Sequence, residues 1–481
     1  MPAGRDESAT YATYQPLSPI YPQQSNQTTA MEKTELTEKV LKNHAHQVKL
    51  SSWLARTGYD TALGKLLRLQ IYYRDALIIL REWRAFLITR KTQIGNTFFA
   101  VDQAIMHADH AQVKQLMQVE PQIRGNDLGI IRILAPSYLL NHPLSLGMNG
   151  LEHQGARALF QQALPDPYEQ TGLLEQPVKR FLSAAAQKGT LHIGDDLPQF
   201  MLEILHQLVF QVSLSEAEAT DSRDFIKGLP FASLPNFVSR YLLWFITNPK
   251  IRHRQQMIER YQDAASWPTY LKTGQQYELD AHGIANSLFD MIHIAGTAGT
   301  SALMGSVIGV LCANSELKAE ATAEATAVWP EGAELTGETL RQATKLHSII
   351  LETARMYPAV RFVSQLAPEA GEVEVGAQRC PFQKGTRLLG SIFTANRDAS
   401  RYENPDGFST DRDFSDLLSW NGNNHERVCP GKALSIELIK IVCLHLLKYY
   451  QWTQSTEVKW DFEKVTAVTP NDLVLQNFSA I

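Results

Sequence analysis

Apolar residues recur at the spacing of an α-helix through most of the chain up to residue 360. Residues 361–400 follow a different pattern, in which short segments containing Val and Phe alternate with Gly, Pro and Asp. Such segments are typical of short β-strands joined by turns. The chain is therefore expected to be mainly α-helical with a minor β portion.

The pattern also predicts the domain organisation. Residues 1 to about 30 are rich in Pro, Gln, Ser, Thr and Tyr, whereas amphipathic sequence begins at Glu32. We predict a flexible N-terminal tail over residues 1–44 and one domain over residues 45–481, because no repeat or long linker divides the remainder. The tail contains no apolar run typical of a signal peptide or membrane anchor, so a soluble, cytoplasmic protein is expected.

Composition narrows the functional classes. With 481 residues, of which 44% are hydrophobic, the chain can bury a large core. A net charge of −5 without a basic tract argues against a nucleic-acid partner. The four cysteines are scattered, with neither the paired spacing of a metal site nor that of a disulfide framework.

Residues 285–314 form a long apolar stretch that has the length of a membrane span. Asp290, His293 and many small residues favour instead a helix through the centre of the protein. Glycines such as Gly296 and Gly299 are unusual there, because each costs about 1 kcal/mol relative to alanine in a helix. Two explanations are open, namely a flat ligand against the backbone or tight helix–helix packing.

Cys429 precedes another apolar helical pattern, over residues 432–450. Pro430 suits the first position of that helix, where no N–H is needed. The unpaired N–H groups and the positive dipole end of a helix lower the pKa of a nearby thiol. Cys429 is therefore a candidate nucleophile or axial haem ligand, and the alternative is an ordinary buried cysteine.

Glu352 and Arg355 lie three residues apart on a predicted helix that ends before Pro358. Pairs of this spacing are usually solvated and contribute little to stability. Both residues lie within or beside the apolar stripe of that helix, which favours a buried pair that needs a further partner.

The order of these elements resembles the cytochrome P450 family over most of the chain after residue 100. In that family a long central helix crosses the haem and is followed by Glu-x-x-Arg, small strands, an arginine-containing meander and a cysteine loop. The matching residues are Glu352 and Arg355, then Arg412 as the arginine that completes a buried triad, then Cys429 followed by Gly431. The resemblance implies a P450-like fold with haem b, iron protoporphyrin IX, between the central helix and the helix after Cys429.

The resemblance also implies which other residues bind the haem. Its two propionates must be neutralised when the ring is buried. The positions that usually contact them hold His153, Arg157, Arg361 and Arg427 in this chain. Gly296 is expected to let the ring approach the central helix.

The cysteine loop departs from the family pattern, which places Phe seven residues before the cysteine. Gly422 occupies that position here, Trp420 lies nine residues before Cys429, and His425 replaces a usual glycine. A longer loop is expected, and hydrogen bonds to the sulfur tune the iron. A lengthened loop also occurs in the fatty-acid peroxygenase branch of the family.

The central helix departs as well. The family carries an acid followed by an alcohol there, which deliver protons to iron-bound oxygen. Ala298 or Gly299 stands at the position of the acid, depending on the alignment, and Asp290 lies too far upstream to replace it. The candidate catalytic residues are Thr300, Ser301 and Gly299, since Thr300 can still organise water.

Three hypotheses follow from the resemblance. The first is a monooxygenase that oxidises a hydrophobic small molecule of lipid or secondary metabolism with an external ferredoxin or flavoprotein reductase. The second is a peroxygenase, or a fatty-acid hydroperoxide isomerase or lyase, that needs no reductase because a peroxide already carries the electrons. The third is a haem-binding relative without turnover.

Overall fold

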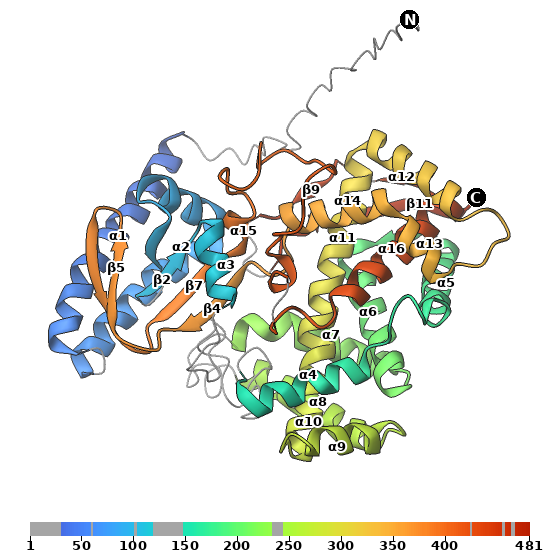
Figure 1. Cartoon of the computed structure of the whole chain (residues 1–481), viewed down its shortest axis with the longest axis horizontal. Helices are drawn as coiled ribbons and strands as arrows, with labels where there is room; N and C mark the ends of the chain where they lie inside the picture. The colour runs from blue at the N-terminus through green and yellow to red at the C-terminus, as the bar shows by residue number, and fades with distance from the viewer. Residues whose placement is uncertain are drawn as a thin grey trace, which may run out of the picture.

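The computed structural model describes residues 30–58, 61–100, 103–118, 148–232, 244–423, 426–454, 457–462 and 467–481. A small sheet-containing part lies to the left in Figure 1, and a larger helical part lies to the right. The predicted fold class, mainly α-helical with a minor β portion, is confirmed.

The helices before the central one are α1 (Ala30–Thr57), α2 (Ala62–Gln93), α3 (His110–Gln118), α4 (Gly150–Ala163), α5 (Thr171–Lys188), α6 (Ile193–Phe210), α7 (Glu216–Ala232), α8 (Trp244–Gln262) and α9 (Trp267–Gln275). The central helix consists of α10 (Ala281–Asp290), the π-helical segment η3 (Met291–Ala298) and α11 (Gly299–Ala313). The helices after it are α12 (Ser315–Val328), α13 (Gly337–Gln342), α14 (Thr344–Met356), α15 (Ile392–Ala395), the 3-10 turn η4 (Ser419–Asn421) and α16 (Lys432–Tyr449).

The strands are short. They are β1 (Thr97–Ala100), β2 (Ala104–His107), β3 (Thr190–His192), β4 (Phe362–Leu366), β5 (Gly371–Val375), β6 (Gln378–Phe382), β7 (Arg387–Ser391), β8 (Tyr450–Gln454), β9 (Lys459–Trp460), β10 (Pro470–Asn471) and β11 (Val474–Ala480). The largest described sheet has the order β1-β2-β7-β4, in which only β2 and β7 are parallel. The small strands predicted over residues 361–400 are therefore β4 to β7. Their distant partners β1 and β2 were not predicted, because four-residue strands carry little pattern.

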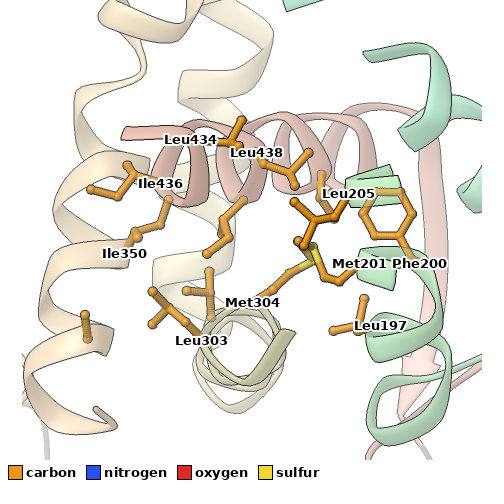
Figure 2. Packing of buried hydrophobic residues seen from close by; sticks show 14 of the residues in the cluster. Leu197, Phe200, Met201, Leu205, Leu303, Met304, Ile350, Leu434, Ile436 and Leu438 are labelled. Atoms are coloured by element: carbon orange, nitrogen blue, oxygen red, sulfur yellow. The ribbon is translucent and has the colours of Figure 1, made fainter. Parts of the chain in front are cut away.

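The central helix lies in the main hydrophobic core and packs against α6, α14 and α16. Figure 2 shows this packing around α11, with labelled side chains Leu197, Phe200, Met201, Leu205, Leu303, Met304, Ile350, Leu434, Ile436 and Leu438. Burying each such side chain contributes about 1.5–3 kcal/mol. Among the described residues, Ala281–Ala313 is long and apolar enough to cross a membrane, but 72% of its most apolar window is buried inside the protein. Core packing thus accounts for its composition.

The predicted N-terminal tail is too long. Helix α1 begins at Ala30, and within it Val40 is fully buried in the core. Gln47 of α1 donates to the carboxylate of Asp75 at 2.9 Å, and Arg90 of α2 pairs with the same carboxylate at 3.0 Å. The boundary predicted between residues 44 and 45 therefore falls inside a packed helix. Helix α1 is mostly polar, so its few buried positions, which pack against α2, were not recognised in the sequence.

Buried histidines give the fold a specific pH dependence. Burial lowers the pKa of His44 to about 3 and the pKa values of His206 and His445 to about 4, from the usual value of 6.5. The folded chain thus binds fewer protons than the unfolded chain between about pH 4 and 6.5, so the free energy of unfolding falls as the pH drops through this window. Burial raises the pKa of Asp290 to about 6 and also raises the pKa values of Glu152 and Glu437, which has the opposite sign. Burial lowers the pKa of four further histidines, however, namely His107, His253, His293 and His347.

We expect the melting temperature to fall continuously from pH 6.5 to about pH 4, since each pKa unit corresponds to about 1.4 kcal/mol. Replacing buried His206 by Gln should flatten this fall, whereas replacing exposed His192 by Gln should leave it unchanged. Thermal unfolding followed by circular dichroism across this range measures the effect. A melting temperature that stays constant or rises toward pH 4.5 would contradict it.

Candidate functional site

Cys429 lies in the turn that leads into α16. Its backbone N–H donates to the carbonyl of Trp420 at 2.9 Å, and the N–H of Lys432 donates to the carbonyl of Cys429 at 3.2 Å. The helix begins at Lys432 with Gly431 as its N-cap, so Pro430 lies outside the helix rather than at its first position. The thiol is free and half-buried.

The charge state of the thiol differs from the prediction. Burial raises the pKa of Cys429, although the Gly431 N–H and the positive charges of Arg157 and Lys432 lower it. Desolvation thus outweighs the helix end, and the expectation of a lowered pKa is wrong for the chain alone. A thiolate here needs a bound cation, and a metal ion deprotonates the thiol that coordinates it. Lys432 was not among the residues predicted for the site, although its position in the first turn of α16, close to Cys429, indicated that its charge acts on the thiol.

The loop before Cys429 is held in an unusual conformation. Trp420 and Asn421 have φ angles of 57° and 63°, in the left-handed region, which costs about 1–2 kcal/mol for a residue such as Trp and is better tolerated by Asn. The Trp420 indole donates to the Ser435 hydroxyl at 3.0 Å, and the Asn421 amide donates to the Arg427 carbonyl at 2.9 Å. These bonds hold the loop in this conformation, and its greater length relative to the family stays a prediction. His425 lies outside the described residues.

Two of the predicted propionate-binding cations meet at the junction of α4 with the cysteine loop. Arg157 of α4 donates to the carbonyl of Val428. In return Arg427 donates to the carbonyl of Met148 at 3.2 Å and to the side chain of Asn149, the N-cap of α4, at 3.1 Å. The two guanidinium groups therefore brace the cysteine loop against α4.

The other two predicted cations differ in position. His153 is half-buried on α4, one turn before Arg157. Arg361 is almost fully buried, donates to the carbonyl of Phe462 at 3.0 Å and lies over the ring of Phe393. Phe462 and Phe393 belong neither to α4 nor to the cysteine loop, and the role of Arg361 toward a propionate stays a prediction.

The predicted triad is assembled. Arg355 holds both carboxylate oxygens of Glu352 at 2.7 and 2.8 Å, and Arg412 donates to the same carboxylate at 3.1 Å. Arg355 also donates to the carbonyls of Asn396 and Gly407 at 2.8 and 2.9 Å, so the triad ties α14 to the meander that precedes the cysteine loop. Breaking such a buried pair by removing one partner costs about 3–5 kcal/mol.

The middle of the central helix is accessible. Ala295 is exposed, and its neighbours Ala298, Gly299 and Thr300 are half-buried, although the flanking turns are buried. A Cβ on Gly299 would meet nothing within 4 Å. The Ser301 hydroxyl turns back to the carbonyl of Thr297 at 2.6 Å. The described surface of this band therefore consists of small apolar groups and the Thr300 side chain.

Gly296 serves a different purpose from Gly299. A Cβ on Gly296 would lie 2.6 Å from Leu205 of α6 and 2.9 Å from the carbonyl oxygen of Met291. Tight helix packing thus accounts for Gly296, while the open face belongs to Gly299. Tight helix packing, one of the two explanations left open by the sequence, therefore applies at Gly296, and a flat ligand against Gly299 stays a prediction.

The residues present fit a haem. Helix α16, whose start follows Cys429, packs against α11, whose start carries Gly299. A half-buried thiol, a flat band of small residues and the paired guanidinium groups of Arg157 and Arg427 correspond to what the group needs: an axial ligand, an apolar face and cations for carboxylates.

The two glycines give a matched test of this geometry. Gly296→Ala should lower the free energy of unfolding by about 1–2 kcal/mol, because overpacking against Leu205 outweighs the helix propensity gained. Gly299→Ala should leave it unchanged or raise it by up to about 1 kcal/mol, since the new methyl group meets no atom. Urea unfolding measures both. Equal losses in the two variants would show that the Gly299 face is packed.

Known proteins resemble this chain over the region that contains the site. A family model described as Cytochrome P450 matches residues 269–476, a range that contains the triad and Cys429. Geranylhydroquinone 3''-hydroxylase of Arnebia euchroma is 26% identical over 217 residues, which cover 43% of this chain and 42% of that protein. Drimenol monooxygenase of Persicaria hydropiper is 26% identical over 183 residues, 36% of each chain. Carnosic acid synthase of Rosmarinus officinalis is 22% identical over 307 residues, 56% of this chain and 60% of that protein.

These alignments span less than two thirds of each relative. A solved structure of a cytochrome P450, CYP102L1, has a TM-score of 0.67 to this chain, covers 82% of it and 94% of its own chain, and is 15% identical, which supports the fold alone. Proteins of the matched family bind iron protoporphyrin IX. The family model over residues 269–476, the relatives and the shared fold together support a member of the cytochrome P450 family.

Proposed function

We propose that this protein is a haem-thiolate monooxygenase that inserts one oxygen atom of O2 into a hydrophobic small molecule. The observation that carries the proposal is the half-buried Cys429 at the start of α16, braced by Arg157 and Arg427 in the region that matches the family model. Relatives named as a hydroxylase and a monooxygenase support the reaction type.

The residues around the sulfur have distinct roles in this proposal. Cys429 coordinates the iron, and the Gly431 N–H stabilises negative charge on the sulfur. Arg157 and Arg427 neutralise the propionates while they hold the cysteine loop against α4. A thiolate-bound haem iron supplies oxygen activation, because electron donation from the sulfur favours O–O cleavage.

The accessible band of the central helix supports a hydrophobic substrate. Ala295, Ala298 and Gly299 offer no charge and no hydrogen-bonding side chain. Such a surface binds apolar groups and excludes water from the reacting carbon. The names of two relatives, geranylhydroquinone hydroxylase and drimenol monooxygenase, fit a terpenoid-like substrate class. Electrons would come from an external ferredoxin or flavoprotein reductase.

One observation favours a second function. Neither Ala298 nor Gly299 supplies the acid that accompanies oxygen activation in the family, and Thr300 is the half-buried hydroxyl nearest to them in sequence. A peroxide already carries two electrons and two protons, so a peroxygenase or a hydroperoxide isomerase would not need that acid. The peroxide-using alternative thus rests on the absence of an acid at Ala298 and Gly299 of the central helix.

Turnover of the haem-loaded protein separates the two functions. We expect product from apolar terpenoid and fatty-acid probes only with O2, NAD(P)H and a reductase, with one NAD(P)H consumed for each oxygen inserted. Liquid chromatography with mass spectrometry and a cofactor assay measure both quantities. Rapid consumption of a fatty-acid hydroperoxide without reductant, and no reductase-driven product, would establish the alternative. A haem protein inert to both would refute enzymatic function.

A further inference from the structure

The first turn of α16 places a lysine beside the cysteine loop. The backbone N–H of Lys432 donates to the carbonyl of Cys429 at 3.2 Å, so the two residues belong to one turn. The Lys432 side chain is half-buried, and its ammonium group donates to the side-chain oxygen of Asn423. The same ammonium group lies over the ring of Trp420, 5.6 Å from its centre, which is within the range of a cation–π contact. Two side chains of the loop thus hold this cation.

The two loop side chains are themselves fixed. The Asn423 amide also donates to the carbonyl of Ser415 at 2.6 Å, and the Trp420 indole donates to the hydroxyl of Ser435 at 3.0 Å. The carbonyl of Trp420 in turn receives the N–H of Cys429 at 2.9 Å. The contacts that shape the loop around the sulfur therefore also fix the position of the ammonium group.

The charge of Lys432 is not neutralised by an acid. Among the described residues no carboxylate forms an ion pair with its ammonium group, and the amide oxygen and indole ring that hold it carry no charge. His347 of α14 has a pKa lowered to about 4 by burial and then by the charges of Lys440 and Lys432, so it is neutral at pH 7. A partly buried cation of this kind is costly unless a negative group compensates it.

The Cys429 sulfur becomes such a negative group when a metal ion binds it. Burial raises the pKa of the Cys429 thiol, and the charges of Arg157 and Lys432 lower it. In return the charge of Cys429 raises the pKa of Lys432, although burial lowers it more. Each group thus favours the charged form of the other. In the proposed function Arg157 neutralises a propionate, so Lys432 is the cation left for the sulfur.

We propose that Lys432 raises the reduction potential of the haem iron by holding a positive charge, unpaired with any acid, beside the thiolate sulfur. The inference rests on the proposed monooxygenase function, in which Cys429 coordinates the iron and an external reductase reduces it. Lys432 acts through the sulfur and is therefore a positioning residue for charge. Its anchors, Asn423 and Trp420, belong to the part of the loop that departs from the family pattern.

The direction of the effect follows from the balance of charge. Ferric iron takes up one electron from the reductase and becomes ferrous iron, with no bond broken, so the site gains one negative charge. A nearby positive charge stabilises the site more after this gain than before it. Because the Lys432 side chain and the sulfur are half-buried, salt screens their interaction less than it screens surface charges. Reduction of the iron is therefore more favourable with Lys432 than without it.

Reductive titration of the haem-loaded protein, followed by its absorption spectrum, measures the potential without turnover. Lys432→Gln should lower the equilibrium constant for one-electron reduction about three- to tenfold, where tenfold corresponds to about 59 mV. Lys432→Arg keeps the charge and should restore the wild-type constant to within about twofold. The matched control is Lys448→Gln, which removes the same charge from the last turn of the same helix, about 24 Å away, and should leave the constant unchanged.

Asn423→Ala tests the fixed position of the charge rather than the charge itself. It removes the amide that holds the ammonium group, so that the Lys432 side chain can turn into solvent. We expect the equilibrium constant to fall in the same direction as in Lys432→Gln but by a smaller factor. The same titration measures it, and this variant keeps the proposal testable where Lys432→Gln does not retain haem. A constant equal to that of the wild type would overturn the role of the anchored position.

The ferrous–carbonyl spectrum separates this inference from the proposed function. With an intact thiolate band, an unchanged potential in Lys432→Gln, or an equal fall in Lys432→Arg, would overturn the role of Lys432 and leave the proposed function standing. A fall of the same size in Lys448→Gln would have the same consequence, because the effect would then come from net charge. A wild-type protein without the thiolate band would overturn both, since no thiolate would face Lys432.

Discussion

Burial of the Cys429 sulfur is the constraint on which the rest of the site depends. Burial raises the pKa of the thiol more than the Gly431 N–H and the charges of Arg157 and Lys432 lower it. The chain alone therefore does not favour a thiolate in this position, whereas a metal ion would deprotonate the thiol on coordination. Other parts of the structure hold the sulfur in place. The loop is turned back at Trp420, braced on α4 and connected through the meander to the Glu352 triad.

The accessible band of the central helix is shaped by packing rather than by charge. The central helix is apolar and packs tightly against α6, α14 and α16. Small residues have two separate roles in this helix. Gly296 lets α6 approach, whereas Gly299 leaves open surface. The polar groups of this region lie on the side of α7 and α8, where His293 and Ser222 are buried.

Sequence patterns predicted those features that depend on few residues at fixed spacing. Glu352 with Arg355, the helix after Cys429 and the small strands after residue 361 belong to this group. Patterns did not predict features that arise from tertiary contacts. The boundary of the N-terminal tail was placed inside α1 because few residues of this helix are buried, and the raised pKa of Cys429 comes from burial, which the local sequence does not reveal. The hydrogen bonds that join Ser222 to His253 and His293 likewise require helices α7, α8 and η3 together.

The claim that Cys429 holds the haem iron is tested most directly by the absorption spectrum of the ferrous–carbonyl protein. The wild type should show the long-wavelength Soret band characteristic of thiolate ligation, and Cys429→Ser should lose it. Cys443→Ser is the matched control, because Cys443 is a fully buried thiol within α16, and it should keep the band. A Cys429→Ser protein that retains the thiolate band would contradict the assignment.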